Sequence, residues 1–417
     1  MNKIYFCIDL KSFFASVECS ERHLDPFEAN LVVADPTRGK GALCLAITPK
    51  MKSLGIKNRC RLFEIPNDVK YHIATPRMKL YMEYSAKIYS IYLKYVSTND
   101  IHVYSIDEVF IDTTDYLKYY KMKPKEFAKM IMQDVFNQTN ITATCGIGTN
   151  LYLAKVALDI LAKHQKDNIA MLNEKLYQKY LWHYLPLTDF WHIGRGISNH
   201  LSRLGINDMY DLAHYREDVL YKEFGINAEY IIDHAWGKEP TTISEIKQYK
   251  PQSNSISHSQ VLFEDYEYQD ALLVLKEMVE VTIYRLIENH LVSDHISLSV
   301  GYSKNIIRGT GGSRKISVRT NSLKIMTNEF VNLFIRTTSK EYPIRTIAIG
   351  FGNLLDEFYE SYDLFTDFEE LDREKRLQEA IIQIKHRYGK NAILKGMNKL
   401  EKATTEKRNT LIGGHNA

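Results

Sequence analysis

Residues 104–112 read YSIDEVFID, a run in which two adjacent carboxylates interrupt an apolar pattern. Apolar residues flank Asp107 and Glu108 on both sides, and the surrounding segments IHVYSI and VFIDTT are typical of two strands of a hairpin. A carboxylate among apolar neighbours is costly to desolvate unless it is paired or bound to a metal. The sequence therefore predicts a hairpin with an acid pair at its corner. It also predicts that the two carboxylates are paired with a cationic group or bind a metal.

A third carboxylate ends another predicted strand. Residues 3–9, KIYFCID, alternate apolar side chains with others and end in Asp9. If this strand lies beside the hairpin, three carboxylates meet at one edge of a sheet. Magnesium prefers such oxygen ligands, and two magnesium ions can activate a 3′-hydroxyl and stabilise a leaving pyrophosphate. The alternative is that Asp107 and Glu108 only polarise a tight turn.

Composition limits the class of protein. The 417 residues are more than one hydrophobic core usually serves, so we expect two to four domains. The net charge of +3 is too small to indicate a nucleic-acid partner by itself. Five cysteines without a CxxC pair argue against a zinc site or a disulfide framework. No apolar run reaches membrane-spanning length, so we expect a soluble, cytoplasmic monomer without a signal peptide.

The pattern of elements changes along the chain. Strands (LVVAD, GALCLAI, ITATCGIG) alternate with helices over about the first 170 residues, which favours an α/β or α+β core. One helix, FFASVEC, can be capped by Ser12, and another begins near Leu151. Residues 174–240 are predicted to be helical, and 241–254 have few apolar residues, as a linker does. Strands return in SISHSQVLF, HISLSVGYS and RTIAIGFGN, with helices at 268–290 and 321–338.

The C-terminal region begins with an acidic stretch, 354–372, which holds eight acids and no base. A final amphipathic helix is predicted over about 373–388, with Asp372 as its N-cap and Gly389 as its stop.

Three motifs occur in order: DLKSFFASVE at 9–18, YSIDEVFID at 104–112 and GIGTNLYLAKVALDILAK at 146–163. Together they resemble the palm motifs of the Y-family, or translesion, DNA polymerases, most closely the UmuC-like (ImpB-MucB-SamB) branch. The resemblance implies template-directed, low-fidelity DNA synthesis past damaged bases in the SOS response, with primer-template DNA and deoxynucleoside triphosphates as substrates. GIG at 146–148 also starts a dinucleotide-binding fingerprint, but the third glycine is missing.

The resemblance also implies an α+β, multidomain, right-hand architecture. Its expected parts are a ferredoxin-like palm at 1–11 and 78–168, small fingers at 12–77, a helical thumb at 169–240, a linker at 241–252, an α/β little finger at 253–354 and a C-terminal acidic segment and helix at 355–417.

By the same resemblance, Asp9, Asp107 and Glu108 are the catalytic metal ligands, and the backbone carbonyl of Leu10 also coordinates one of two Mg²⁺ ions. In the nucleotide pocket, Phe14 blocks a ribose 2′-hydroxyl while Phe13 belongs to the core; the alternative places both in the core.

Lys155, Asp159 and Lys163 share a helical face at i, i+4 and i+8. Lys163 matches the family position that meets the triphosphate, although a solvated face is the alternative.

One segment departs from the family pattern. TPKMKSLGI at 48–56 places Pro49 and Lys52 where relatives commonly carry a Tyr and an Arg over the triphosphate. Lys52 keeps the charge but not the bidentate fork of Arg, so Arg59 or Arg61 is a candidate to compensate.

Two regions are candidates for DNA contact. FWHIGRGISNHLSRLGI at 190–206 is similar to a helix-hairpin-helix with a glycine hairpin, Gly194–Arg195–Gly196, and a helix capped by Ser198 and ended by Gly205. Residues 300–346 hold nine Lys or Arg against two acids. A solvated face is the usual explanation of such a charge run, but it lies where the family has its little finger. The predicted phosphate contacts there are Lys304, Arg308, Arg314 and Lys315.

SYDLF at 361–365 resembles the QLxLF-type peptide that bacterial polymerases insert into the sliding clamp. Ser361 and Tyr362 depart from that pattern, whereas Leu364 and Phe365 match its anchors. The alternative is that both anchors fold back onto the protein. Two other functions stay open, a nucleotidyl cyclase and a non-catalytic DNA-binding subunit derived from a polymerase. The predicted hairpin and basic domain argue against the first, and the intact acid triad argues against the second.

Overall fold

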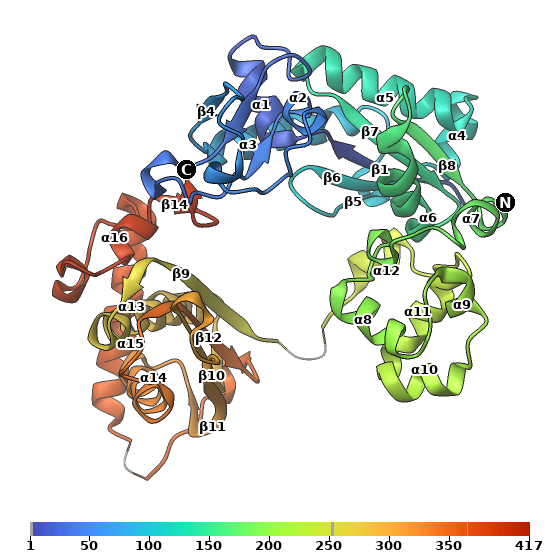
Figure 1. The fold of residues 1–417 in the computed structure, drawn as a ribbon. Coiled ribbons are helices and arrows are strands. Elements are labelled where there is room, and N and C mark those ends of the chain that lie inside the picture. The colour runs from blue at the N-terminus through green and yellow to red at the C-terminus, as the bar shows by residue number, and fades with distance from the viewer. Residues whose placement is uncertain (1–2, 252–253, 365) are drawn as a thin grey trace. The chain divides into compact units, whose positions relative to one another are not determined.

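The computed structural model describes residues 3–251, 254–364 and 366–417, which form two compact units (Figure 1). The first unit contains the residues up to Tyr249 together with His415–Ala417, and the second contains Lys250–Gly414. Among the described residues, no helix is long and apolar enough to cross a membrane.

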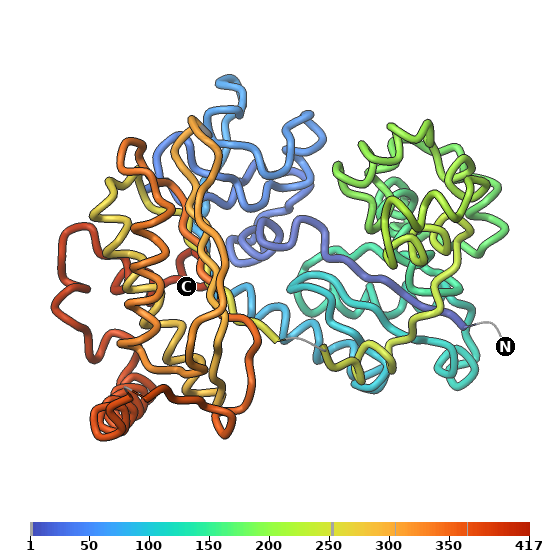
Figure 2. The backbone as a smooth tube through the Cα atoms, turned by 90° about the horizontal axis from the view of Figure 1, so that it is seen from below, coloured from blue at the N-terminus to red at the C-terminus, as the bar shows by residue number. Residues whose placement is uncertain are grey.

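A five-stranded sheet organises the first unit, in the order β5-β6-β1-β7-β8. Its central strand β1 (Tyr5–Leu10) is antiparallel to β6 (Glu108–Asp112) and to β7 (Ala143–Gly148). Figure 2 shows β1 in dark blue beside the cyan hairpin segment. The outer strands are β5 (Ile101–Val103) and β8 (Ile169–Leu172).

Both faces of β1 are buried because its side chains alternate between two clusters. Phe6, Ile8 and Leu10 pack under α3 (Met78–Tyr92) and α5 (Pro124–Thr139). Tyr5 and Cys7 face the opposite side, where α6 (Leu151–Val156) packs. A short helix α4 (Thr114–Tyr120) follows β6. The predicted strand and hairpin are therefore confirmed, and Asp9 lies at the centre of the sheet rather than on its edge strand.

A smaller three-stranded sheet follows β1 in the chain, in the order β3-β2-β4. It contains β2 (Leu31–Val33), β3 (Ala46–Ile47) and β4 (His72–Ala74), with α1 (Phe13–Glu21) and α2 (Pro49–Ser53) beside it.

Two expectations in this region were wrong. Only the last two residues of GALCLAI form a strand, because Cys44 bonds instead to the carbonyl of Cys60. Ser12 does not cap α1 through its side chain; it adopts a left-handed conformation with φ 49° at the turn after β1.

Five helices pack around the buried residues Leu201, Leu212 and Ile231, as expected for 174–240. They are α7 (Glu174–Leu181), α8 (Arg195–Arg203), α9 (Met209–Ala213), α10 (Glu217–Phe224) and α11 (Ala228–Ala235).

The predicted linker 241–252 contains a short helix that was not anticipated, α12 (Ile243–Gln248). Thr242 and Glu245 form a reciprocal capping box, in which the Thr242 side chain accepts from the Glu245 amide and the Glu245 carboxylate accepts from the Thr242 amide. Ile243 is 2% exposed and joins the cluster of Phe110. The scarcity of apolar residues in this segment gave no sign of the helix, because one buried side chain and a cap are enough to hold a helix of this length.

The second unit is built on an antiparallel sheet in the order β11-β10-β12-β9. Its strands are β9 (Ile256–Tyr266), β10 (Leu291–Tyr302), β11 (Thr310–Thr320) and β12 (Ile344–Gly352), and the short β13 (Leu355–Asp356) pairs with β10. Helices α13 (Tyr268–Glu288) and α14 (Leu323–Thr337) cover one face (Figure 1). The predicted strands and helices of this region are confirmed.

The C-terminal helix α15 (Phe368–Tyr388) begins earlier than predicted. Its N-cap is Asp367, whose carboxylate accepts from the Glu370 amide at 3.0 Å, so the predicted cap Asp372 lies inside the helix. Gly389 ends the helix as predicted. The remaining elements, α16 (Thr405–Arg408), β14 (Leu411–Ile412) and β15 (His415–Asn416), were not anticipated.

Candidate active site

Strand pairing brings the three predicted carboxylates to one place. Asp9 and Glu108 are directly paired across β1 and β6, and the Leu10 amide donates to the carbonyl of Asp107 at 3.0 Å. The hairpin corner is fixed from two sides: the Ser105 hydroxyl donates to the Asp107 carboxylate at 2.6 Å, and the Ser85 hydroxyl of α3 donates to the carbonyl of Ile106 at 2.6 Å. These hydrogen bonds fix the hairpin corner that carries Asp107 and Glu108.

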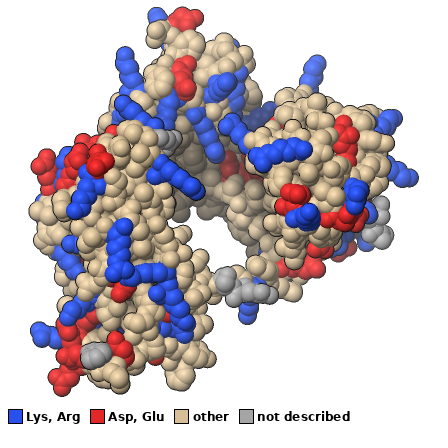
Figure 3. Space-filling model, turned by 60° about the horizontal axis from the view of Figure 1, so that its bottom comes forward, with Lys and Arg blue, Asp and Glu red and all other residues tan. Residues whose placement is uncertain are grey.

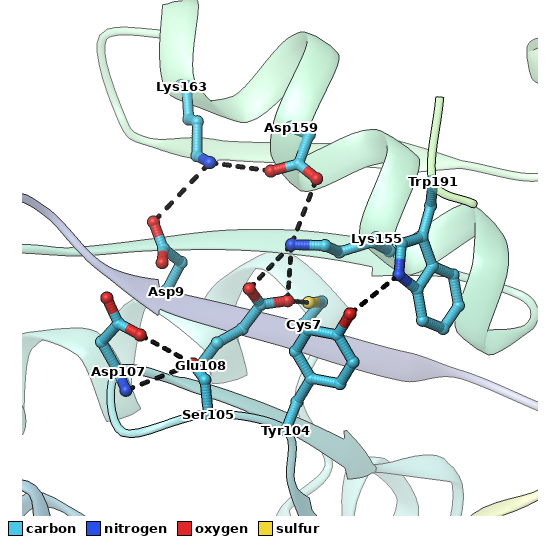
Figure 4. A network of polar contacts seen from close by, with 10 residues as sticks. All are labelled: Cys7, Asp9, Tyr104, Ser105, Asp107, Glu108, Lys155, Asp159, Lys163 and Trp191. Carbon is cyan, nitrogen blue, oxygen red and sulfur yellow. Dashed lines mark hydrogen bonds and ion pairs between the residues drawn. The ribbon is translucent and has the colours of Figure 1, made fainter. Parts of the chain in front are cut away.

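The three carboxylates are not free ligands in this structure, because each already has a polar partner. Both oxygens of Glu108 lie 2.7 Å from the Lys155 ammonium, and the Cys7 thiol donates to Glu108 Oε1 at 3.1 Å (Figure 4). Among the described residues, no three His, Cys, Asp or Glu side chains are assembled to hold a metal ion. The donor set nevertheless fits magnesium, because three hard oxygen donors line a single cavity.

Lysines of one helical segment neutralise the acids. Lys155 is 3.1 Å from Asp159, and Lys163 is 2.7 Å from Asp159 and 3.8 Å from Asp9. Figure 4 shows the resulting chain of alternating charges. The prediction that Lys155, Asp159 and Lys163 lie on one face is confirmed. The segment is not a uniform α-helix, because Ala157–Leu161 is π-helical and Ala162–His164 is a 3-10 turn.

This charge balance shifts pKa values. Burial raises the pKa of Asp9 to about 6; the nearby Lys163 opposes the shift, while the charges of Asp107 and Glu108 add to it. Burial works to lower the pKa of Lys163, but Asp9 and Asp159 outweigh it and hold that pKa above its usual value. Lys163 therefore stays charged where it faces the cavity.

Two glycines explain why the lysine-bearing helix lies so close to the sheet. A Cβ on Gly146 would fall 2.1 Å from the carbonyl oxygen of Ala154, and one on Gly148 would fall 2.1 Å from the Ala154 amide. The motif GIG therefore serves helix–strand packing, and it places Lys155 over β1. A dinucleotide is not needed to account for these glycines.

A cavity of about 760 Å³ opens above the acids. Its lining includes all the residues predicted to bind metal, Asp9, Leu10, Asp107 and Glu108, and all those predicted to bind nucleotide, Phe13, Phe14, Lys52 and Lys163. Lys11, Asn58 and Arg59 also line it. Sequence reasoning missed two of these residues: Lys11 lies within DLKSFFASVE but was given no role there, and Asn58 lies outside the quoted motifs.

The two phenylalanines differ as predicted in their burial. Phe13 is 3% exposed within the main core, whereas Phe14 is half-buried on the cavity wall. The Phe14 ring stacks on Tyr81 with centroids 4.5 Å apart, and the Tyr81 hydroxyl donates to buried Glu18 at 2.7 Å. Tyr81 was missed by sequence reasoning, since its distance from Phe14 along the chain gives no signal.

The departure at 48–56 has a local structural reason. Pro49 occupies the first turn of α2, where its fixed φ suits a helix start, and Lys52 on the same helix reaches the cavity. Of the two candidates to compensate, Arg59 lines the cavity, while Arg61 donates to the carbonyl of Gly41 at 2.8 Å. Arg59 therefore shares the cavity wall with Lys52.

The predicted glycine hairpin is the start of a helix. Gly194 is the N-cap of α8, Arg195 is its first residue, and all three residues of Gly194–Arg195–Gly196 are exposed. Ser198 is not the cap: its amide bonds to the Gly194 carbonyl within the first turn. A Cβ on Gly194 or Gly196 would meet nothing within 4 Å, so internal packing does not require glycine at either position.

The sheet of the second unit has an open face of short side chains. Ser313, Ser297, Gly350 and Ser257 are paired across all four strands and form one row on this face. Figure 3 shows Lys and Arg side chains in blue on both units, with acids in red among them, so charge alone does not single out this face.

Strand register separates the predicted basic contacts. Lys315 is paired with His295 and is exposed, and Lys304 and Arg308 are exposed before β11. Arg314 is paired with the core residue Ile296 and forms an ion pair with Glu329 of α14. Arg314 thus lies on the helix face of the sheet, whereas Lys315, also predicted as a phosphate contact, lies on the opposite face. Alternation of side chains in a strand accounts for the difference.

The predicted clamp-binding stretch has one anchor that the structure describes. Leu364 is 99% exposed, so it does not fold back onto the protein. Ser361 is fixed to β11, because its hydroxyl accepts from the Arg319 amide at 2.7 Å. Phe365 lies outside the described residues.

Comparisons with known proteins agree with this geometry. The impB/mucB/samB family model matches residues 8–159, and the model of the impB/mucB/samB family C-terminal domain matches 253–364. "Putative UV-damage repair protein UvrX" of Bacillus subtilis (strain 168) is 33% identical over 99% of this chain and 97% of that protein. "DNA polymerase IV 2" of the same organism is 30% identical over 99% of this chain and 98% of that protein.

Among solved structures, a "Y-family DNA polymerase chimera Dbh-Dpo4(243-245)-Dbh" is similar with a TM-score of 0.64 at 20% identity, covering 85% of this chain and 99% of that chain. The chain therefore belongs to the impB/mucB/samB family, within the Y-family of DNA polymerases. Its fold is the α+β, multidomain polymerase fold, and its class is DNA-directed DNA polymerase, as the three motifs indicated.

Proposed function

We propose that this protein is a translesion polymerase that extends a primer 3′-hydroxyl by two-metal-ion nucleotidyl transfer. The observation that carries the proposal is the single cavity lined by Asp9, Asp107 and Glu108 together with Phe14 and Lys163. Acids and a neighbouring lysine on the wall of one cavity suit a metal-bound triphosphate. Low fidelity and bypass of damaged bases are part of the proposal, and they rest on the family and on the name of the UvrX relative.

Asp9, Asp107 and Glu108, with the backbone carbonyl of Leu10, would hold two Mg²⁺ ions. When bound, such ions lower the pKa of the primer hydroxyl and neutralise charge on the triphosphate. The protein's own groups do the remaining work. Lys163 stays charged beside Asp9 and would contact the triphosphate together with Lys52 and Arg59.

The sugar of the incoming nucleotide would meet Phe14. Tyr81 stacks behind this ring and Phe13 is fixed in the core, so the wall cannot retreat without cost. A ribose 2′-oxygen would therefore clash with an aromatic face that is held in place.

DNA would be held through its backbone by both units. In the first, the exposed turn Gly194–Arg195–Gly196 would present amides to a phosphate. In the second, Lys304, Arg308 and Lys315 border an open sheet face of Ser and Gly that allows close approach. Phosphate contacts carry no base information, which a polymerase requires. On this proposal the first unit holds palm, fingers and thumb, and the second holds the little finger.

The test is primer extension with the full-length protein on matched undamaged and damaged templates. Asp107→Ala should lower the extension rate by about 100-fold or more, because a metal loses a ligand, while DNA affinity changes by less than about twofold. Asp115→Ala is the matched control, since Asp115 is a 90% exposed acid of the same unit. Wild-type extension by Asp107→Ala would overturn the metal assignment, and a lack of any extension by the wild type would favour the non-catalytic alternative.

A further inference from the structure

A buried lysine occupies the place that a metal ion would need on Glu108. The Lys155 ammonium is 2.7 Å from both carboxylate oxygens, and each of the two side chains is 9% exposed. An ammonium at that distance occupies one lone pair of each oxygen and repels a second cation that approaches from the cavity. Glu108 is therefore a poorer metal ligand while this contact persists.

Lys155 has a second acidic partner ready. Asp159, one helical turn along, is 3.1 Å from the ammonium. The Tyr104 ring lies 5.7 Å from the same ammonium and adds a cation–π contact. If Glu108 turned away, Lys155 would keep a counter-ion and an aromatic face, and no buried charge would be left alone.

We propose that Lys155 is a positioning residue that withholds Glu108 from the catalytic metals until nucleotide enters, and that it then keeps Asp159 as its partner. The inference rests on the proposed two-metal function. A divalent cation carries twice the charge of an ammonium, so it can displace Lys155 once the triphosphate supplies its other ligands. The metal-free protein thereby avoids three unpaired carboxylates at one edge.

A purely structural role would not need a charge here. A buried ion pair is expensive to desolvate, and apolar side chains in place of both partners usually pack as well or better. The chain instead brings the lysine in closely, by placing Gly146 and Gly148 under its helix. Cys7 also donates to Glu108, so the withheld carboxylate is fully hydrogen-bonded.

Direct binding of Mn²⁺ to the full-length protein tests the inference without any turnover, by calorimetry and by loss of the free Mn²⁺ electron paramagnetic resonance signal. Lys155→Met keeps the length and removes the charge, and it should bind Mn²⁺ about tenfold more tightly. Asp159→Asn removes the alternative partner, leaves Lys155 on Glu108, and should weaken Mn²⁺ binding. Opposite shifts in these two variants are the expected signature, whereas equal affinities, or shifts in the same direction, would overturn the inference.

Folding and the proposed function are controlled separately. Lys155→Met should melt at a lower temperature than wild type without metal and recover with Mn²⁺. If it does not fold, two other variants test the inference. Asp159→Asn should still show weaker Mn²⁺ binding, and Lys155→Arg, which keeps the charge, should bind Mn²⁺ as wild type does. Glu108→Gln should lose Mn²⁺ affinity, and adding Lys155→Met to it should change nothing further. If Glu108→Gln binds as wild type does, the metal assignment fails; if it binds weakly but Lys155→Met equals wild type, only the withholding role fails.

Discussion

Single side chains in the nucleotide pocket are held by partners that lie far away in the sequence. Phe14 stacks on Tyr81, whose hydroxyl is bound by Glu18, and Glu18 in turn accepts two bonds from Arg77. Each link is buried or half-buried, so the aromatic wall has little freedom to move. The size limit on the sugar is thus a property of this network as well as of one ring.

Phe14→Ala should remove that limit. We expect the preference for deoxyribonucleotides over ribonucleotides to fall by about tenfold or more, because the space beside the sugar then admits an oxygen. Single-nucleotide incorporation kinetics with both substrates give the ratio. Phe63→Ala is the control, since Phe63 is 64% exposed and does not line the cavity. An unchanged ratio in an active Phe14 variant would place the limit elsewhere.

Asp9 should make stability depend on pH in the absence of metal. Its pKa is about 6 in the folded protein against 3.8 ordinarily, so ionisation of Asp9 destabilises the folded state as pH rises through 6. Asp9→Asn should therefore raise the free energy of unfolding by about 3 kcal/mol at pH 8, and the gain should vanish below pH 4.

Chemical denaturation across that pH range, in chelator, measures the Asp9 effect. Asp115→Asn, which changes a 90% exposed acid, should show no such trend. A gain for Asp9→Asn that is equal at pH 4 and pH 8 would contradict the assigned cause.

Part of this site could be predicted from the sequence. Strand ends and motif order indicated Asp9, Asp107 and Glu108, since these depend on local patterns. The link between Lys155 and Glu108 could not be predicted, because it depends on how closely a helix approaches a sheet over Gly146 and Gly148. Arg314 was predictable in principle: side chains alternate along a strand, so the neighbour of Lys315 lies on the opposite face.

Whole helices and strands followed the sequence where apolar periodicity was strong. The strands and helices of the second unit were predicted for that reason, whereas α12 and α16 were missed because they are short and held by side-chain contacts.

The last turns of the chain gather around buried Glu277 of α13. Its carboxylate accepts from Asn398, and from the Thr404 amide at 2.7 Å and its hydroxyl at 3.0 Å.

Glu277→Ala should destabilise the second unit by about 3 kcal/mol, because several buried donors lose their acceptor. Differential scanning calorimetry gives the change, and faster proteolysis near residues 395–410 would localise it. Glu264→Ala is the matched control: its ion pair with Lys402 is exposed, so we expect a change within about 0.5 kcal/mol. Equal effects of the two substitutions would contradict the proposed role of Glu277.

Considered as a whole, the molecule divides its tasks between two units. The cavity with the acids and the exposed start of α8 belong to the first, and the open sheet face and the acidic stretch belong to the second. The acidic stretch, with eight acids over 354–372, is unsuited to phosphates. Its exposed apolar residue Leu364 indicates a protein partner.

We predict that 361–365 docks into the hydrophobic groove of a sliding clamp. Leu364 is 99% exposed while Ser361 is bonded to the Arg319 amide, so the segment starts from a fixed point and presents its anchor to solvent. Burying two large apolar side chains contributes several kcal/mol of binding, since anchors of this kind dominate small interfaces. Leu364→Ala with Phe365→Ala should abolish clamp-stimulated synthesis and leave clamp-independent extension unchanged.

Primer extension with and without clamp measures both rates. Calorimetric titration of clamp with a peptide of residues 356–370 measures docking alone. Phe358→Ala is the control, because Phe358 is 85% exposed in the same acidic stretch and lies outside 361–365. If the Phe358 variant loses stimulation as fully as the double variant, exposed apolar area in general, and not the 361–365 segment, is what the clamp recognises. A peptide that gives no heat at high micromolar concentration would remove the docking assignment altogether.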